Sequence, residues 1–174
     1  MTFDPYRYNL GMKFLTSEWH ASYQTTDSKS RTLDDYEPLD RYREHLEKIR
    51  SELPVCLVEI YGETDILHDA HIHAVQQIGS DLKVQVLLAL LYDPEASTKI
   101  SAQPAELTYA GVEYLHYRMK DPNGGESDYS PHEIIYNEFD VLDDDLFSHT
   151  FLLRSYDELC ICARSLLFSR GIAF

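Results

Sequence analysis

The side chains best suited to chemistry lie together in residues 68–73, which read His-Asp-Ala-His-Ile-His. Imidazole and carboxylate groups are ligands that zinc, iron and manganese accept. On a helix His68 and His71 would share a face, whereas on a strand His71 and His73 would share one. Because a catalytic metal usually needs three protein ligands, a surface histidine cluster is the favoured interpretation. The alternative is a metal-dependent hydrolase that uses His68, Asp69, His71 and His73.

A second group of possible ligands is the run Asp143, Asp144 and Asp145, which follows Glu138 and Asp140. Calcium loops of the EF-hand type place acids at alternate positions around a glycine and end on a glutamate. That pattern is absent, because three consecutive acids point in different directions. The run is therefore predicted to be a solvated turn between strands, and no cofactor is expected.

Acidic residues are concentrated late in the chain. The formal net charge is −15, and residues 121–158 hold eleven acids and a single base, Arg154. A field of this sign repels nucleic acid and anionic membranes and attracts a basic protein. The longest apolar run, residues 86–92, is too short to span a membrane, and no secretory signal is visible, so a cytoplasmic location is expected.

Tyrosine is unusually frequent, with thirteen copies, and several of them lie in or beside the acidic stretch. Tyrosine next to carboxylates suits a protein contact surface, because the ring supplies contact area at a small cost in rotamer entropy. Tyrosine also simply favours strands, so the count alone does not decide the matter. The residues predicted to form a binding face are Tyr129, Tyr136, Asp140, Asp143, Asp144 and Asp145.

Signatures of common enzyme classes are missing from the chain. It has no Gly-x-Ser-x-Gly, no Walker loop and no Gly-x-Gly-x-x-Gly, and no histidine is paired with a nucleophile in sequence. Its three cysteines, Cys56, Cys160 and Cys162, are an odd number. Cys160 and Cys162 would share one face of a strand, and a buried pair of small apolar side chains is the favoured interpretation. These patterns favour binding over catalysis.

Hydrophobic spacing predicts helices first. A short helix begins at Thr16 or Ser17, and a longer amphipathic one covers residues 38–52 and ends at Pro54. Residues 55–61 are compatible with either a helical extension or a strand. Apolar residues at steps of three and four also predict a helix over residues 67–78, closed by Gly79.

Later segments alternate or run apolar between turn residues, as strands do. Strands are predicted over residues 82–92, 107–119, 134–141, 150–153 and 159–168, with a bulge or bend at Ala110-Gly111 in the second. Short links between them indicate antiparallel pairing. The prediction is an α+β fold with N-terminal helices packed on a mostly antiparallel sheet. Residues 1–11 form a lead-in extension, and residues 12–174 form a single α+β domain.

One stretch of the chain resembles a known family. Residues 12–20, Met-Lys-Phe-Leu-Thr-Ser-Glu-Trp-His, are similar to the opening of a family of uncharacterised bacterial proteins. Members of this domain of unknown function begin Met-Lys-aromatic-aromatic-Thr-x-Glu-Trp, and Leu15 departs from that pattern. Residues 67–70, Leu-His-Asp-Ala, resemble a second stretch of the family. The resemblance implies a cytosolic bacterial protein and makes His68 and Asp69 the best functional candidates.

A weaker similarity concerns residues 147–170, which resemble in style the β-rich immunity proteins of bacterial toxin systems. Together with the charge, it leads to the hypothesis of a non-enzymatic protein-binding module with an acidic, tyrosine-rich face. Its expected partner is a basic protein, and toxin inhibition is its narrowest version.

Overall fold

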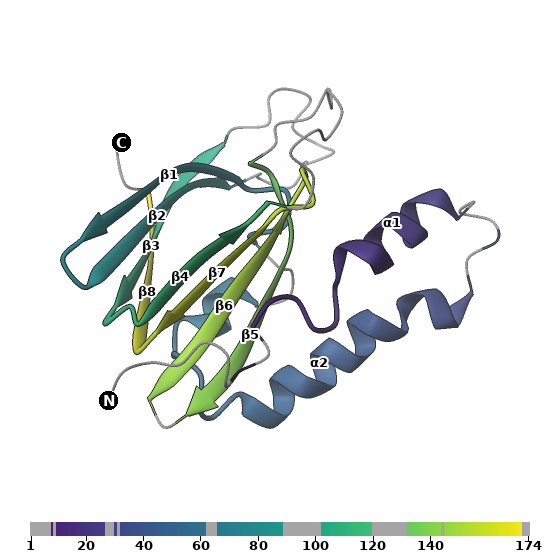
Figure 1. Cartoon of the computed structure of the whole chain (residues 1–174), viewed down its shortest axis with the longest axis horizontal. Helices are drawn as coiled ribbons and strands as arrows, with labels where there is room; N and C mark the ends of the chain where they lie inside the picture. The colour runs from purple at the N-terminus through teal and green to yellow at the C-terminus, as the bar shows by residue number, and fades with distance from the viewer. Residues whose placement is uncertain are drawn as a thin grey trace.

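The computed structural model describes residues 8, 10–26, 30, 32–61, 66–88, 102–119, 132–143 and 145–171. Within them, helices come first and antiparallel sheets follow, so the predicted mixed α+β fold is confirmed at this level (Figure 1). No helix in these ranges combines the length and the apolar character that a membrane crossing requires.

Across the described residues, eight strands form two antiparallel sheets, ordered β1-β2-β3-β8 and β4-β7-β6-β5. The strands are β1 (His71–Ile78), β2 (Asp81–Leu88), β3 (Gln103–Ala110), β4 (Tyr114–Arg118), β5 (Ile134–Asp143), β6 (Leu146–Leu153), β7 (Glu158–Ala163) and β8 (Ser165–Arg170). The pairing is antiparallel, as the short links indicated.

Two strand pairs run from one sheet into the other. β3 pairs with β8 in the first sheet, and β4 and β7, which adjoin them in sequence, pair in the second. The chain changes sheet at Gly111, where φ is +63°, and at Arg164, whose backbone N–H donates to the Ala110 carbonyl. The predicted change of direction at Ala110-Gly111 is therefore confirmed, but residues 107–119 and residues 159–168, each predicted as one strand, each form parts of two strands. Glycine suits the first corner because its backbone is left-handed there.

The sheets enclose a common apolar core and meet again at a bridge between His71 and Glu133. Core residues come from β2, β3, β5, β6, β7 and β8, and they include Val84, Val86, Leu107, Phe139, Phe151, Ile161 and Leu166. Burial of such side chains stabilises a fold by about 1.5–3 kcal/mol each.

Helices cover the side of the molecule next to β5 (Figure 1). They are α1 (Ser17–Thr25), the 3-10 turn η2 (Leu33–Tyr36), α2 (Glu37–Ile49) and α3 (Leu57–Ile60). The Thr16 hydroxyl accepts a hydrogen bond from the Trp19 N–H and caps α1, as predicted. In α2, Pro38 occupies the first turn, and Tyr42 is the buried residue that contacts β5.

The helix predicted over residues 67–78 is wrong: residues 71–78 are the strand β1. Its backbone pairs with β2, with Val75 opposite Val84. Asp69 has a left-handed backbone conformation, φ +61°, which a right-handed helix cannot include. Its N–H donates to the Ile134 carbonyl instead of to a helical partner. Gly79 serves the turn between β1 and β2 at φ +64°. Residues 71–78 are therefore a strand because they pair with β2, although their apolar residues are also spaced as in a helix.

A chain of hydrogen bonds crosses the core between the sheets and the helices. His149, which is 0% exposed, lies between the Tyr109 hydroxyl at 2.6 Å and the Asn137 Oδ1 at 3.1 Å. The Tyr61 hydroxyl donates to Asn137, and it lies 2.9 Å from the Tyr42 hydroxyl. Since Asn137 Oδ1 only accepts, His149 carries its proton on Nε2 and accepts from Tyr109 on Nδ1. Its imidazole is therefore neutral.

Burial gives His149 a defined effect on stability at low pH. Desolvation lowers its pKa well below the ordinary value, so the unfolded chain binds the proton more tightly than the native one. The free energy of unfolding should therefore fall as the pH drops below about 6.5, the ordinary histidine pKa. Urea denaturation between pH 7.5 and pH 5 measures this. In a His149→Leu variant the decline should be smaller, and an equal decline in both proteins would contradict the assignment.

Candidate functional site

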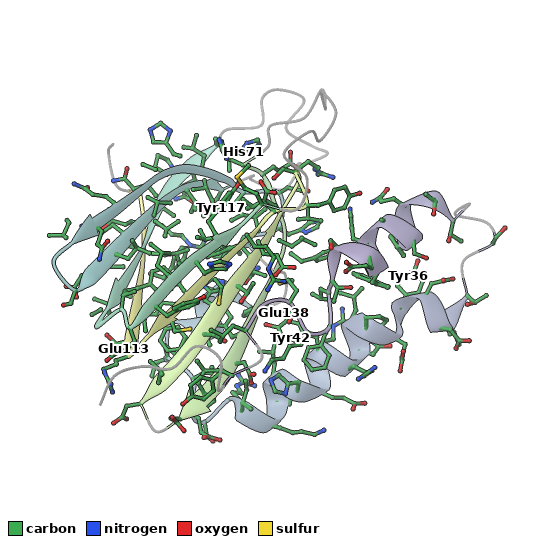
Figure 2. The ribbon with its side chains drawn as sticks, in the orientation of Figure 1. Tyr36, Tyr42, His71, Glu113, Tyr117 and Glu138 are labelled. Carbon is green, nitrogen blue, oxygen red and sulfur yellow. The ribbon has the colours of Figure 1, made fainter. Side chains whose placement is uncertain are left out.

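Aromatic rings from distant parts of the sequence form a continuous row on one side of the molecule. Neighbouring ring centroids lie between 5.3 and 5.9 Å apart. In order, this aromatic row consists of Tyr36, Tyr23, Trp19 and Tyr136, followed by His20 and His68, which both contact Tyr136, and by Tyr156, which contacts His20. Tyr36 forms one end of the row, next to Tyr23, and Figure 2 shows it between α1 and α2.

Three different segments meet at Tyr136. Trp19 and His20 come from α1, His68 from the turn before β1, and Tyr136 itself from β5. Trp19 and His20 belong to the first stretch that carried the family resemblance, and His68 belongs to the second. The fold thus brings the two stretches together around a residue that was predicted to bind. Trp19 is fixed by its indole N–H, which donates to the Asp35 carbonyl at 3.0 Å.

Charged groups line the His68 end of the row. The His68 Nδ1–H donates to the Ile135 carbonyl, which leaves Nε2 facing Asp69 Oδ1 at 3.7 Å. Arg154 forms an ion pair with Glu133 and lies 3.5 Å from Asp69. The Asp69 side chain remains 51% exposed, so it is available to a further cation.

His20 is the most enclosed member of the row. It is 3% exposed, and its Nδ1 has no hydrogen-bond partner within the described part of the chain. Its pKa is lowered by burial first and then by electrostatic interaction with Arg154 and with His68. His20 is therefore held as a neutral imidazole beside a guanidinium group.

Tyr156 adopts a backbone conformation that tyrosine rarely occupies. Its φ is +64°, in the turn between β6 and β7, where its N–H donates to the Leu153 carbonyl. For a residue with a Cβ this conformation costs roughly 1–2 kcal/mol, and glycine is the usual choice. A ring retained at such a position, in contact with His20, indicates that the ring itself has a role.

The four residues of the metal hypothesis do not converge in this structure. His68 turns to the Ile135 carbonyl and Tyr136, while His71 Nε2 lies 3.9 Å from Glu133 Oε2. His73 lies at an irregularity in the pairing of β1 with β2. Among the residues that the structure describes, no three His, Cys, Asp or Glu side chains are placed to hold a metal ion. The geometry therefore offers no support for the hydrolase alternative.

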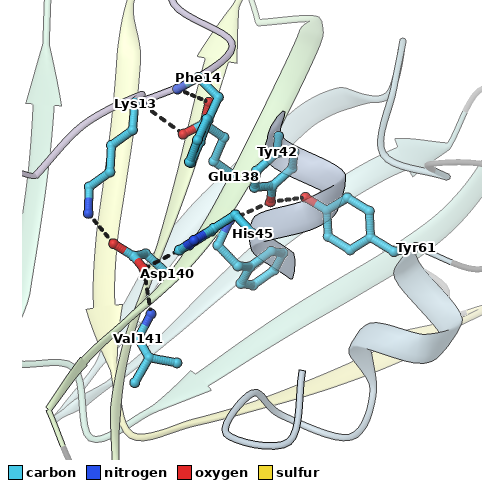
Figure 3. Close-up of polar contacts among 9 residues, drawn as sticks. Lys13, Phe14, Tyr42, His45, Tyr61, Glu138, Asp140 and Val141 are labelled. Atoms are coloured by element: carbon cyan, nitrogen blue, oxygen red, sulfur yellow. Dashed lines mark hydrogen bonds and ion pairs between the residues drawn. The ribbon is translucent and has the colours of Figure 1, made fainter. Parts of the chain in front are cut away.

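Two acids of the predicted binding face, Asp140 and Asp143, make contacts within the chain, and Figure 3 shows those of Asp140. Asp140 pairs with Lys13 and accepts a hydrogen bond from His45 at 3.0 Å. Asp143 accepts from the Tyr8 hydroxyl, and Asp145 is exposed in the turn between β5 and β6 with φ +61°. Tyr129 and Asp144 lie outside the described residues. Of the six predicted binding residues, Tyr136 alone is shown to belong to the aromatic row.

Glu138, in the same region, accepts hydrogen bonds from the backbone of the segment before α1. Its Oε1 accepts the N–H groups of Phe14 at 2.9 Å and Leu15 at 2.5 Å, and its Oε2 accepts that of Lys13 at 2.7 Å (Figure 3). Burial raises its pKa, and the three N–H groups act in the opposite direction. The carboxylate thus ties the segment before α1 to β5.

The cysteine prediction is confirmed in its geometry. Cys160 and Cys162 share the outer face of β7 and are both buried, beside Leu10 and Leu146. Cys56 is half-buried, and its thiol donates to the Leu166 carbonyl.

Comparisons of this chain with protein-family models, with curated proteins and with solved structures found no match. The resemblance to an uncharacterised bacterial family therefore stays a prediction. Sequence reasoning did not include Glu133 or Arg154 in the site. Tyr156 is one of the tyrosines in the acidic stretch, which was the available signal, but it was not among the predicted binding residues.

Proposed function

We propose that this protein is a protein-binding module and that the aromatic row receives a basic segment of its partner. The observation that carries the proposal is the row itself, in which the left-handed Tyr156 contacts His20 and extends it. Tyrosine and tryptophan are enriched in protein interfaces, because their rings bury a large area with few rotatable bonds. Trp19, Tyr23, Tyr136 and Tyr156 are half-buried, so their rings are held in place and still accessible.

Charge around the row suits a basic partner. Asp34 and Asp35 lie in η2 next to Tyr36, and the half-exposed Asp69 lies beside His68 at the other end. A lysine or arginine side chain of a partner could stack on a ring and reach one of these carboxylates. The chain's net charge of −15 would also speed the approach of such a partner. Inhibition of a basic bacterial toxin is the narrower version of this proposal, and a cytoplasmic bacterial protein is its expected setting.

The variant Tyr156→Gly should weaken binding while it leaves the stability of the fold nearly unchanged. The ring is lost while the left-handed backbone becomes unstrained, so the free energy of unfolding should change by less than about 1 kcal/mol. Binding to basic peptides should weaken by about tenfold or more, as expected for an aromatic interface residue. Fluorescence anisotropy with arginine-rich, lysine-rich and glutamine-rich peptides measures the affinity, and urea denaturation measures the stability.

Asp145→Gly is the matched control. It also places glycine at a left-handed position, but in the turn between β5 and β6, away from the aromatic row. Asp145 belongs to the acidic turn that the sequence had favoured as the binding face. If the aromatic row is the site, Asp145→Gly leaves peptide affinity within about twofold of the wild type. Weakened binding in Asp145→Gly together with unchanged binding in Tyr156→Gly would move the site to the acidic turn. No binding of any basic peptide above the glutamine-rich control would argue against the proposal as a whole.

A further inference from the structure

Helix α1 supplies Trp19, His20 and Tyr23 to the aromatic row, and it has no large aliphatic side chain with which to dock. Its sequence, Ser-Glu-Trp-His-Ala-Ser-Tyr-Gln-Thr, contains no leucine, isoleucine, valine or methionine. Ser17 and His20 are its buried residues. Its side chains contact the sheets through the rings of Trp19 and His20, and the Trp19 indole N–H donates to the Asp35 carbonyl. Helices normally dock through an aliphatic stripe, which α1 lacks.

His20 is therefore the buried ring on which the docking of α1 depends. It contacts Tyr136 of β5 at 5.4 Å, edge to face, and Tyr156 of the β6–β7 turn at 5.9 Å. A neutral imidazole suits this aromatic enclosure, whereas an imidazolium would be buried with a nitrogen, Nδ1, that finds no acceptor within the described residues.

Two groups on other elements act electrostatically on His20. Arg154 and His68 both oppose a charge on His20. Of the acids on those elements, Glu133 is paired with Arg154 and lies near His71, and Asp69 lies 3.5 Å from Arg154. On α1 itself, Glu18 is exposed on the helix surface. Among the described residues, no acid forms an ion pair with His20, and none offsets the effect of Arg154 on it.

We infer that His20 is an acid-sensitive latch: its protonation releases α1 from the sheets and takes the aromatic row apart. In the released helix His20 is surrounded by water and has an ordinary pKa of about 6.5. In the docked helix its pKa is lower, so the released form binds the proton more tightly. Docking is therefore strongest above about pH 6.5 and weakens about tenfold for each pH unit below it, until the docked histidine also titrates.

Trp19 reports on this step directly, since it is the only tryptophan in the chain and lies next to His20. In the full-length protein, acrylamide quenching of its fluorescence should rise at least twofold as the pH falls from 7.5 to 5. Far-UV circular dichroism in the strand region should stay constant over the same range and fall only at a lower pH, when the sheets unfold. The two signals thus separate release of α1 from general acid unfolding.

His20→Phe is the decisive variant, because it keeps a ring in the enclosure and removes the proton site. The rise in quenching should disappear until the sheets unfold. His68→Asn is a milder second variant that retains a side-chain N–H for the Ile135 carbonyl and removes one positive neighbour, so the transition should move to lower pH. A wild-type protein in which quenching and circular dichroism change together would overturn the inference, as would a His20→Phe protein with the wild-type transition.

The consequence for binding rests on the proposed function: affinity for the arginine-rich peptide should fall over the same pH range in the wild type and not in His20→Phe. The quenching experiment contains no peptide, so release of α1 is tested even if no peptide binds. Conversely, a peptide that binds equally at pH 7.5 and pH 5, after quenching has shown release, would mean that α1 is not needed for binding.

Discussion

Replacing His149 by leucine should lower the free energy of unfolding by about 3–5 kcal/mol, although the two side chains have similar volumes. The imidazole accepts from Tyr109 and donates to Asn137, both inside the core. It also stacks on Phe139 at 3.7 Å and contacts Phe151 at 4.0 Å between ring centroids. Leucine leaves the Tyr109 hydroxyl buried with no acceptor and gives up the ring stacking. Urea denaturation at pH 7.5 measures the loss.

Removal of the hydroxyl as well should recover part of this stability. In the double variant Tyr109→Phe with His149→Leu, no polar atom of residue 109 is left unpaired, so the double variant should be more stable than the sum of the two single changes by about 1–2 kcal/mol. Strict additivity would show that the bond between Tyr109 and His149 contributes nothing, and it would contradict the role assigned to the network. The single variant Tyr109→Phe completes the cycle.

This network also marks a limit of what the sequence can predict. His149 comes directly before the strand predicted over residues 150–153, and a lone histidine near a strand is interpreted as a hydrogen-bonded core or rim residue. Its partners, Tyr109 and Asn137, belong to other strands, and Tyr61 follows a helix. Local spacing contains no information on which strands become neighbours, and neighbouring strands decide whether a buried imidazole is satisfied.

Elements were predictable where one periodicity dominated. Residues 38–52 alternate charged and apolar positions at helical spacing, and α2 covers Glu37–Ile49. Residues 82–88 alternate with period two and have the buried pattern of β2. The helix predicted over residues 67–78 was wrong because the apolar residues of this segment fit both a helix and a strand, and pairing with β2 makes residues 71–78 a strand. The strand breaks at Gly111 and Arg164 show how a long predicted strand can serve two sheets.

The candidate site was harder to predict than the elements. Tyr136 and the pair His68 and Asp69 were singled out from sequence, yet the row also needs α1 and the β6–β7 turn, which no spacing rule connects to them. Asp140, which was expected to face a partner, is instead paired with Lys13 in the segment before α1. Glu138, which was considered only as a possible metal ligand, accepts backbone N–H groups of the same segment. A net charge indicates the sign of a surface, but it does not reveal which of its charges are satisfied within the chain.

Replacing Glu138 by leucine should lower the free energy of unfolding by about 3–6 kcal/mol, an effect as large as that of His149→Leu. Three consecutive backbone N–H groups, those of Lys13, Phe14 and Leu15, have this carboxylate as their acceptor. Leucine accepts no hydrogen bond, and each buried donor left without a partner costs about 1–3 kcal/mol. The segment before α1 should detach from β5, and hydrogen exchange at the amides of Phe14 and Leu15 should become faster.

Glu138→Gln tests whether acceptor geometry or charge produces this stability. Its amide oxygen can take the place of Oε1, which accepts from both Phe14 and Leu15, while its NH₂ group must then face the Lys13 N–H. The loss should therefore be smaller, about 1–2 kcal/mol, with amide protection of Phe14 and Leu15 largely kept. Because burial raises the pKa of Glu138, its charged form is the one that folding disfavours, and removing the charge offsets part of the lost bond at neutral pH. Equal losses in the leucine and glutamine variants would contradict this account, since the two differ in whether any acceptor remains.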